Sequence, residues 1–198
     1  ANAEAYTRMF TALIENWRQE WATDFPFYYV QIAPYQYENP EVGVLVREAQ
    51  RNTLSVPKTG MVVVSDIGNT RDIHPRNKAD VGKRLAHWAL AKTYGKEGIP
   101  YSGPLYKAME VEGKKVRLFF EHAQNGLLAR GGALTHFEIA GEDGVFIAAK
   151  ARIDGNTVVV SSRAVKSPRA VRFAWGNTAE PNLFNTEGLP ASAFRTQP

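Results

Sequence analysis

The segment from Met61 to Pro75, MVVVSDIGNTRDIHP, constrains the fold more than any other part of the chain. It begins with four apolar residues, Met61 to Val64, a short run of the kind that forms a fully buried strand. Small polar residues and a glycine break the run, and Asp72 and His74 follow before a segment with helical periodicity. In a parallel α/β sheet, ligands usually bind at the carboxyl ends of the strands. The sequence therefore predicts a site in the loop that carries His74.

Two interpretations of this loop are open from the residues alone. A histidine with a carboxylate two residues earlier suits general acid/base catalysis near neutral pH. A solvated loop histidine, beside an aspartate that caps the following helix, fits the same spacing, and the spacing alone favours this second interpretation.

Residues 1 to 100 carry the patterns of an α/β domain. Apolar and aromatic side chains recur at helical spacing from Ala3 to Trp21 and predict a helix packed against a core; they are Tyr6, Phe10, Leu13, Ile14, Trp17 and Trp21. Phe27 to Ala33 predicts a buried strand, and Val42 to Gln50 predicts the helix that follows it, with Leu45 and Ala49 facing inward. A third helix is expected to begin at Asn77 and to end near Gly95.

A change of pattern at residues 98–104, GIPYSGP, predicts a domain boundary, and no helical periodicity follows it. Turn signals such as Asp143-Gly144 and Asp154-Gly155 separate short apolar runs, which predicts a small antiparallel β-sandwich in residues 101 to 198. The tail from Asn182 to Pro198 is rich in turn residues and is expected to lie over a neighbouring element without regular structure. The predicted strands are Lys115 to Phe120, Val145 to Ile153, Thr157 to Ser161 and Val171 to Trp175.

Composition excludes several classes of function. The net charge of +4 comes from 24 basic and 20 acidic residues that are well mixed, so no nucleic-acid interface is predicted. The absence of cysteine excludes disulfides and thiolate metal ligands. No apolar run approaches the length of a membrane span, and Glu4 and Arg8 interrupt the start, which is not expected to be a signal peptide. No metal or other cofactor is expected, because no spacing typical of a transition-metal site joins the four histidines, His74, His87, His122 and His136.

Dispersed segments are similar to the sialate O-acetylesterase (sialic acid-specific 9-O-acetylesterase) family, a branch of the SGNH hydrolases. DIGNTRDIHPRNKADVGKRLA, from Asp66 to Ala86, resembles the catalytic-histidine block of that family. Seven other segments also resemble that family: FPFYYVQIAPY, LVREAQ, GPLY, FFEHAQNGL, FEIAGEDGVF, AVRFAW and NLFNTEGLPASAFRT. The resemblance implies the C-terminal part of an SGNH (flavodoxin-like) parallel-sheet hydrolase domain in residues 1–100. A β-sandwich accessory domain in residues 101–198 is expected to follow it.

The resemblance implies that His74 is the general base of an ester hydrolase that forms an acyl-enzyme on a serine. SGNH hydrolases commonly place an aspartate three residues before the histidine, where this sequence has Arg71. Asp72 is the nearest carboxylate and the predicted acid. Asp66, or a backbone carbonyl in place of a carboxylate, are the alternatives.

Three residues are predicted to bind the substrate: Tyr35, Arg47 and Gln50. Tyr35 belongs to the loop from Pro34 to Pro40, and tyrosine rings can cover the apolar face of a sugar while the hydroxyl makes a hydrogen bond. Arg47 and Gln50 lie in the segment LVREAQ and could bind a substrate carboxylate or position a loop. An ordinary surface loop for the tyrosines, and a salt bridge on the helix surface for Arg47, are the alternatives.

The expected function is that of a carbohydrate O-acetylesterase that removes acetyl groups from sialic acid. The Gly-Asp-Ser block of the family is absent from the 198 residues, so the serine is expected on the N-terminal half of the same enzyme, present as a separate chain or a cleaved precursor. Two strands that are apolar on both faces also need further neighbours. The alternatives are a non-catalytic carbohydrate-binding or interaction subunit and an acetylxylan-type polysaccharide esterase. The resemblance suggests a secreted, periplasmic or lysosomal location.

Overall fold

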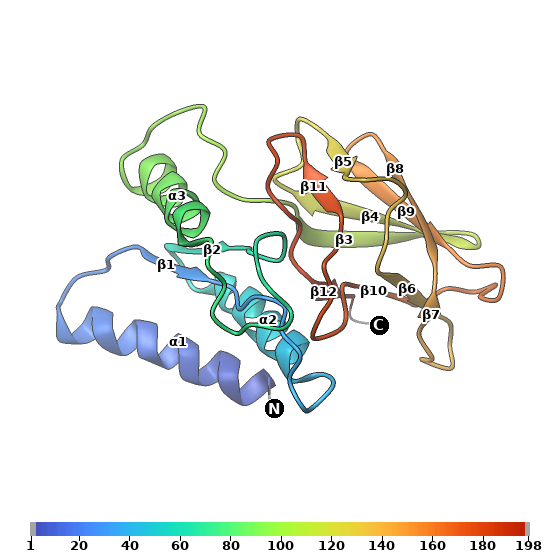
Figure 1. Cartoon of the computed structure of the whole chain (residues 1–198), viewed down its shortest axis with the longest axis horizontal. Helices are drawn as coiled ribbons and strands as arrows, with labels where there is room; N and C mark the ends of the chain where they lie inside the picture. The colour runs from blue at the N-terminus through green and yellow to red at the C-terminus, as the bar shows by residue number, and fades with distance from the viewer. Residues whose placement is uncertain (1–2, 197–198) are drawn as a thin grey trace. The chain divides into compact units, whose positions relative to one another are not determined.

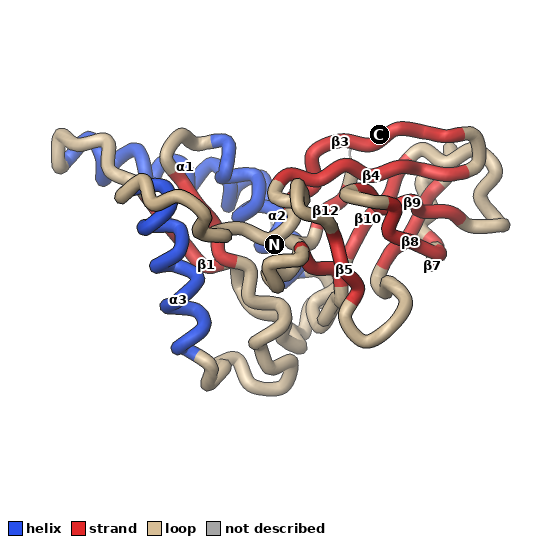
Figure 2. The backbone as a smooth tube through the Cα atoms, turned by 90° about the horizontal axis from the view of Figure 1, so that it is seen from above, coloured by secondary structure: helices blue, strands red, loops and turns tan. Residues whose placement is uncertain are grey.

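The computed structural model describes residues 3 to 196, without the side chain of Glu4, and the chain divides into two compact units. Unit 1 consists of Ala1–Ser102 together with Gly176–Thr178, and unit 2 consists of Gly103–Trp175 together with Ala179–Pro198. The predicted mixed α/β class is confirmed, with helices in unit 1 and antiparallel strands in unit 2 (Figures 1 and 2). None of the described helices is long and apolar enough to cross a membrane.

Unit 1 is built around two parallel strands. Tyr29 of one strand lies opposite Met61 of the other, and Val30 lies opposite Val62. The second strand begins and ends two residues earlier than the apolar run Met61 to Val64 predicts. In chain order, the elements are α1 (Ala3–Glu20), β1 (Phe27–Val30), α2 (Val42–Asn52), the 3₁₀ turn Thr53–Ser55, β2 (Thr59–Val62), α3 (Lys78–Trp88) and the π-helical turn Ala89–Thr93 (Figure 1).

The third helix begins where its sequence predicts, whereas α3 itself ends at Trp88 and the π-helical turn Ala89–Thr93 continues to the predicted end near Gly95. The side chain of Asn77 accepts a hydrogen bond from the backbone N–H of Asp80, which satisfies one of the unpaired amides at a helix start. Gly95, just beyond the last helical turn, has a φ of +64°, a conformation that glycine adopts without strain. Between these ends, the inner face of α3 packs Val81, Leu85 and Trp88 onto the strand pair.

Gly60 of β2 lies against the indole of Trp88, and this close approach yields a first prediction. A Cβ at position 60 would lie 2.4 Å from the ring, so Gly60→Ala is expected to destabilise the protein by roughly 1–3 kcal/mol through overpacking. The matched control is Gly82→Ala on α3, where nothing lies within 4 Å of an added Cβ. The control should gain about 0.5–1 kcal/mol, because alanine favours a helix interior. Denaturant unfolding of a reversibly folding form of the protein measures both, and an unchanged midpoint for Gly60→Ala would contradict the packing.

An aromatic layer joins α1 to β1. Phe10 contacts Phe27 and Tyr29 edge-to-face, with ring centroids 5.9 and 4.9 Å apart, and Trp17 lies 5.9 Å from Phe27. Ile14 is fully buried in this layer. The predicted apolar face of α1 is, however, wider than the part of it that packs against β1. Five large apolar side chains of α1 and its end remain exposed: Tyr6, Met9, Leu13, Trp17 and Trp21.

Unit 2 contains two four-stranded antiparallel sheets and one strand pair. Their orders are β3-β4-β9-β8, β12-β10-β6-β7 and β11-β5. The strands are β3 (Leu105–Glu112), β4 (Lys115–Glu121), β5 (Leu127–Ala129), β6 (Phe137–Ala140), β7 (Ile147–Ala148), β8 (Lys150–Asp154), β9 (Thr157–Ser161), β10 (Ala170–Phe173), β11 (Leu183–Asn185) and β12 (Phe194–Arg195).

Two predictions for unit 2 were wrong. The expected strand Val145 to Ile153 is two strands, β7 and β8, which belong to different sheets. The tail also contains regular structure, because β11 pairs with β5 and β12 pairs with β10. The last two residues of the predicted tail, 197 and 198, lie outside the described part of the chain.

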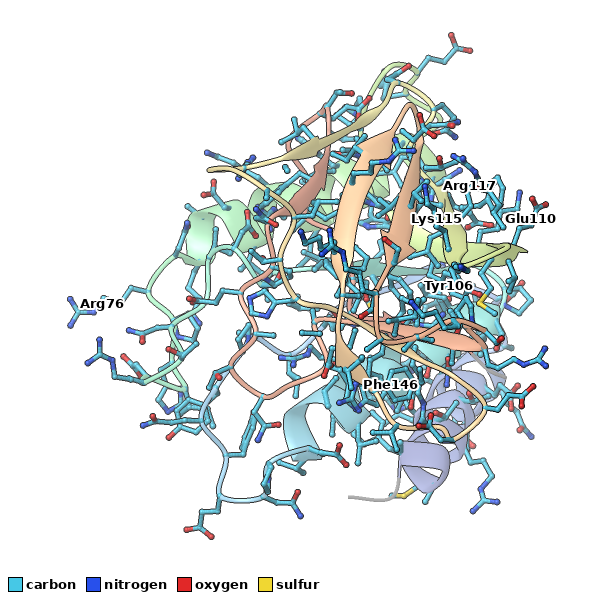
Figure 3. The ribbon with its side chains drawn as sticks, turned by 90° about the vertical axis from the view of Figure 1, so that its right-hand side faces the viewer. Arg76, Tyr106, Glu110, Lys115, Arg117 and Phe146 are labelled. Carbon is cyan, nitrogen blue, oxygen red and sulfur yellow. The ribbon has the colours of Figure 1, made fainter. Side chains whose placement is uncertain are left out.

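Phe194 in that tail is fully buried and connects the two larger sheets. Its ring stacks on Tyr106 of β3 at 4.7 Å and lies 5.6 Å from Phe173 of β10. On the surface, Arg117 of β4 pairs with Glu112 and Asp154, and Lys115 and Glu110 lie beside it (Figure 3). The carboxylates of Glu112 and Asp154 raise the pKa of Arg117 further above its ordinary value.

Candidate active site

A cavity of about 500 Å³ lies at the carboxyl ends of β1 and β2. Residues 30–35 and Tyr37 line it from the β1 side, and Val64, Ile67 and Gly68 line it from the β2 side. The loop after β2 contributes Asp72, Ile73 and Pro75, and α3 contributes Lys78 and Val81. The loop that the sequence singled out therefore borders this cavity.

His74 lies between two of the lining residues, Ile73 and Pro75, and its side chain is exposed. Asp72 Oδ1 accepts a hydrogen bond of 2.9 Å from the backbone N–H of His74. This contact is an Asx turn, which fixes the backbone conformation of the loop around the histidine. Arg76, two residues further, extends away from the loop (Figure 3). A contact of the Asp72 carboxylate with the imidazole ring stays a prediction.

Asp66, the alternative acid, is held by another partner. Both of its carboxylate oxygens accept hydrogen bonds of 2.7 Å from the guanidinium of Arg84 on α3. The two side chains are only 10 % and 12 % exposed, and Arg84 also donates to the carbonyl of Val63 at 2.7 Å. This two-point ion pair fastens α3 to the chain that leaves β2. Between the two aspartates, the geometry favours Asp72 for a role at His74.

The Tyr35 loop contributes two aromatic rings to the cavity. Tyr35 and Tyr37 are half-buried, and their rings meet edge-to-face with centroids 5.0 Å apart. The backbone N–H of Gln36 donates to the carbonyl of Thr70, which ties this loop to the loop that precedes His74. The structure thus brings Tyr35 and Asp72 to one cavity, and substrate binding by Tyr35 stays a prediction.

Arg47 is buried, with 3 % of its surface exposed, so the salt bridge expected on the helix surface is replaced by internal contacts. Its guanidinium donates to the backbone carbonyls of Gly176 and Asn177, 3.4 Å to the latter. Burial lowers the pKa of Arg47 to about 10. Its Nε is buried without a hydrogen-bond partner among the described residues. These contacts position the chain around α2, and binding of a substrate carboxylate by Arg47 stays a prediction.

Gln50 has 5 % of its surface exposed and completes the edge of β1 that faces away from β2. Its Oε1 accepts from the backbone N–H of Ile32 at 2.9 Å, and its Nε2 donates to the carbonyl of Val30 at 3.2 Å. The side-chain amide therefore takes the place of one peptide group of a neighbouring strand. Its predicted role as a substrate ligand stays a prediction beside this structural one.

Asn177 is the residue of this region that the sequence patterns missed. It lies between β10 and β11 in sequence but belongs to unit 1, where it is bonded to the Tyr35 loop and to α2. No periodicity or motif marks it, because its partners are more than 130 residues away in sequence.

Among residues 3 to 196, no group of three or more histidine, aspartate and glutamate side chains could hold a metal ion. The candidate site is a polar loop and an aromatic loop at the carboxyl ends of parallel strands. In parallel α/β sheets, ligands usually bind at this position.

Comparisons with known proteins show which proteins this chain resembles. No protein-family model matches the chain. The solved structure of a carbohydrate acetylesterase from Xanthomonas citri matches all of the chain with a TM-score of 0.92 and 42% sequence identity. The match covers 47% of that protein's chain.

The curated relatives are sialate O-acetylesterases. The mouse protein is 36% identical over 135 residues and the rat protein 34% identical over 132 residues. Each match covers 56% of this chain and 24% of the relative, so the matched region is about a quarter of the length of either relative. These matches support the resemblance of the chain to the sialate O-acetylesterase family, on the C-terminal half.

Proposed function

We propose that this chain supplies the general base of a carbohydrate O-acetylesterase that removes O-acetyl groups from sialic acid. The observation that carries the proposal is the His74 loop beside a cavity at the carboxyl ends of β1 and β2. The fold around it matches a carbohydrate acetylesterase, and the sequence matches two sialate O-acetylesterases.

In the proposed reaction, a serine hydroxyl from polypeptide outside these 198 residues attacks the acetyl carbonyl. His74 accepts the serine proton and then donates it to the departing sugar oxygen. Water hydrolyses the acetyl-serine in the second half, again with His74 as base. Asp72 holds the loop through the backbone of His74 and, we propose, orients the imidazole ring. The donors that stabilise the oxyanion also come from outside this chain.

Acetate release tests the function directly. The chain, combined with a serine-bearing N-terminal half from a family member, is offered 9-O-acetylated sialic acid, acetylated xylan and 4-nitrophenyl acetate. The proposal expects acetate from the sialic acid ester and the small ester. Release from xylan alone would move the substrate to plant polysaccharide. Sugar binding without acetate release from any substrate would indicate a binding module.

The acid assignment is tested by two matched amide variants. Asp72→Asn is expected to lower kcat by about 10- to 100-fold without changing stability, because an amide keeps part of the hydrogen bonding but loses the charge. Asp66→Asn is expected to act on stability instead, with a loss of about 3–5 kcal/mol, because it leaves the largely buried guanidinium of Arg84 without a counter-charge. Steady-state kinetics and denaturant unfolding of both variants separate the two roles. A fully active Asp72→Asn enzyme beside a folded but inactive Asp66→Asn enzyme would reverse the assignment.

A further inference from the structure

We infer that Asn177 is a positioning residue for substrate binding: its side-chain amide fixes the loop that brings Tyr35 and Tyr37 to the cavity beside Asp72. The inference rests on the proposed function for its substrate, an acetylated sugar, and on hydrogen bonds within unit 1 for its geometry. It assigns a role in the site to a residue that lies about 100 positions after His74 in the sequence.

The amide of Asn177 makes contacts on both sides of the loop. Its Oδ1 accepts from the backbone N–H of Gly43 at 2.8 Å, at the start of α2. Its Nδ2 donates to the carbonyl of Asn39 at 2.6 Å and lies 3.5 Å from the carbonyl of Tyr37. The backbone carbonyl of Asn177 accepts from the N–H of Tyr35 at 3.0 Å. One residue therefore bonds both ends of the loop and closes it.

Asn177 is held in place by the residues that surround it. It is 7 % exposed, and the guanidinium of Arg47 donates to its carbonyl and to the carbonyl of Gly176. Gly43 leaves the space that the amide fills, since a Cβ there would lie 2.9 Å from Asn177 Oδ1 and 3.0 Å from the ring of Tyr37. The bonds of its guanidinium to these two backbone carbonyls account for the burial of Arg47.

The consequence for binding follows from the loop's composition. Tyr35 and Tyr37 line the cavity, whereas Asn39 and Glu41 at the far end of the loop are exposed. Without the amide, the peptide groups at Tyr37, Asn39 and Gly43 lose their common partner and the loop samples more conformations. A sugar that stacks on the two rings must then order the loop as it binds, which weakens binding without touching the proton transfers at His74.

The test uses the assembled esterase and compares Asn177→Ala with Asn185→Ala. Asn185 is a matched control in unit 2: it is 2 % exposed, its Oδ1 accepts from a backbone N–H and its Nδ2 donates to a backbone carbonyl. We expect Asn177→Ala to raise KM for 9-O-acetylated sialic acid about tenfold, with kcat within about twofold of the parent. Hydrolysis of 4-nitrophenyl acetate, which is too small to need the loop, should change by less than about twofold. Asn185→Ala should change neither constant.

Hydrogen exchange gives a readout that does not require activity. In Asn177→Ala, the peptide that contains residues 35–43 should exchange at least about tenfold faster, while the same peptide in Asn185→Ala keeps the parent rate. Gly43→Ala, whose Cβ would press on both the amide and the ring of Tyr37, should reproduce the faster exchange, and an unchanged exchange rate in it would overturn the role if Asn177→Ala does not assemble.

The outcomes separate the two proposals. Unchanged exchange of residues 35–43 in both variants, or faster exchange with an unchanged KM, overturns the positioning role. A parent complex that hydrolyses none of the esters contradicts the proposed function. The dissociation constant of the acetylated sugar, measured by calorimetry, then replaces KM as the readout. In that case a dissociation constant raised about tenfold still supports the role of Asn177, and an unchanged one overturns it.

Discussion

His74→Ala is expected to lower kcat for ester hydrolysis by on the order of 10⁴-fold or more, because it removes the proposed general base that takes the serine proton. The imidazole is exposed on a loop and is absent from the buried core of unit 1, so the variant should unfold at the parent temperature. Hydrolysis of 4-nitrophenyl acetate by the assembled enzyme, together with a thermal melt, measures both effects.

The chain provides its own control histidine. His87 lies on α3 in the same unit, with Nδ1 2.9 Å from the carbonyl of Pro100, and, unlike His74, it has no sequence neighbour among the residues that line the cavity. His87→Ala should therefore retain activity. Because His74 is exposed, added imidazole should diffuse into the His74→Ala site and restore part of the rate. Near-parental turnover by a folded His74→Ala enzyme, before imidazole is added, would remove His74 from the mechanism.

The sequence predicted those parts of unit 1 whose signals are local. The side chain of Asn77 caps α3, Gly95 follows its end, and the apolar runs at Phe27 and Met61 mark the two parallel strands within two or three residues. The same local reasoning placed Asp72 and His74 in a loop after the second strand. These features depend on neighbours three or four residues away, so a single sequence contains them.

Features that depend on distant partners were not predictable in this way. Arg47 and Gln50 look like surface residues of a helix, and only the carbonyls of residues 176 and 177 and the edge of β1 explain their burial. In β3, only Leu105 is buried, so the strand has no apolar alternation to detect. The short strands β11 and β12 exist through their pairing with β5 and β10 rather than through their own pattern.

The second large effect concerns the stability of unit 1 when residues 1–198 are expressed alone. The exposed face of α1 includes Met9 at 73 % exposure, Trp17 at 43 % and Leu13 at 40 %. The sheet beneath it has two strands among the described residues, and β1 pairs only with β2. Fully burying each large apolar side chain is worth about 1.5–3 kcal/mol, and a domain's net stability is about 5–15 kcal/mol. Leu13 and Trp17 are already more than half buried, so leaving this face uncovered forfeits only part of that energy for each residue, on the order of a few kcal/mol in total, which is a large share of such a net stability.

We therefore expect the isolated chain to aggregate or to unfold at low denaturant concentration, and to be rescued by an N-terminal half that covers this face. Gel filtration and a denaturant melt, with and without that half, measure the rescue. An exposed β-strand edge adds to the tendency to associate with other chains. Unit 2 has its own buried core around Phe194, so part of the chain should remain folded in the melt.

Substitutions on α1 distinguish a docking face from general instability. Replacing Met9, Leu13 and Trp17 together by glutamine should make the isolated chain more soluble and, at the same time, prevent rescue by the N-terminal half. The matched control is Glu15→Gln, an exposed position on the opposite side of α1, which should change neither property. If the chain were unstable for a general reason, the triple variant would raise or lower solubility and assembly together. It would not raise solubility while preventing assembly. A monodisperse isolated chain that unfolds in one cooperative transition would show that residues 1–198 close their own core, and the partner proposed for the active site would then have no interface to occupy on α1.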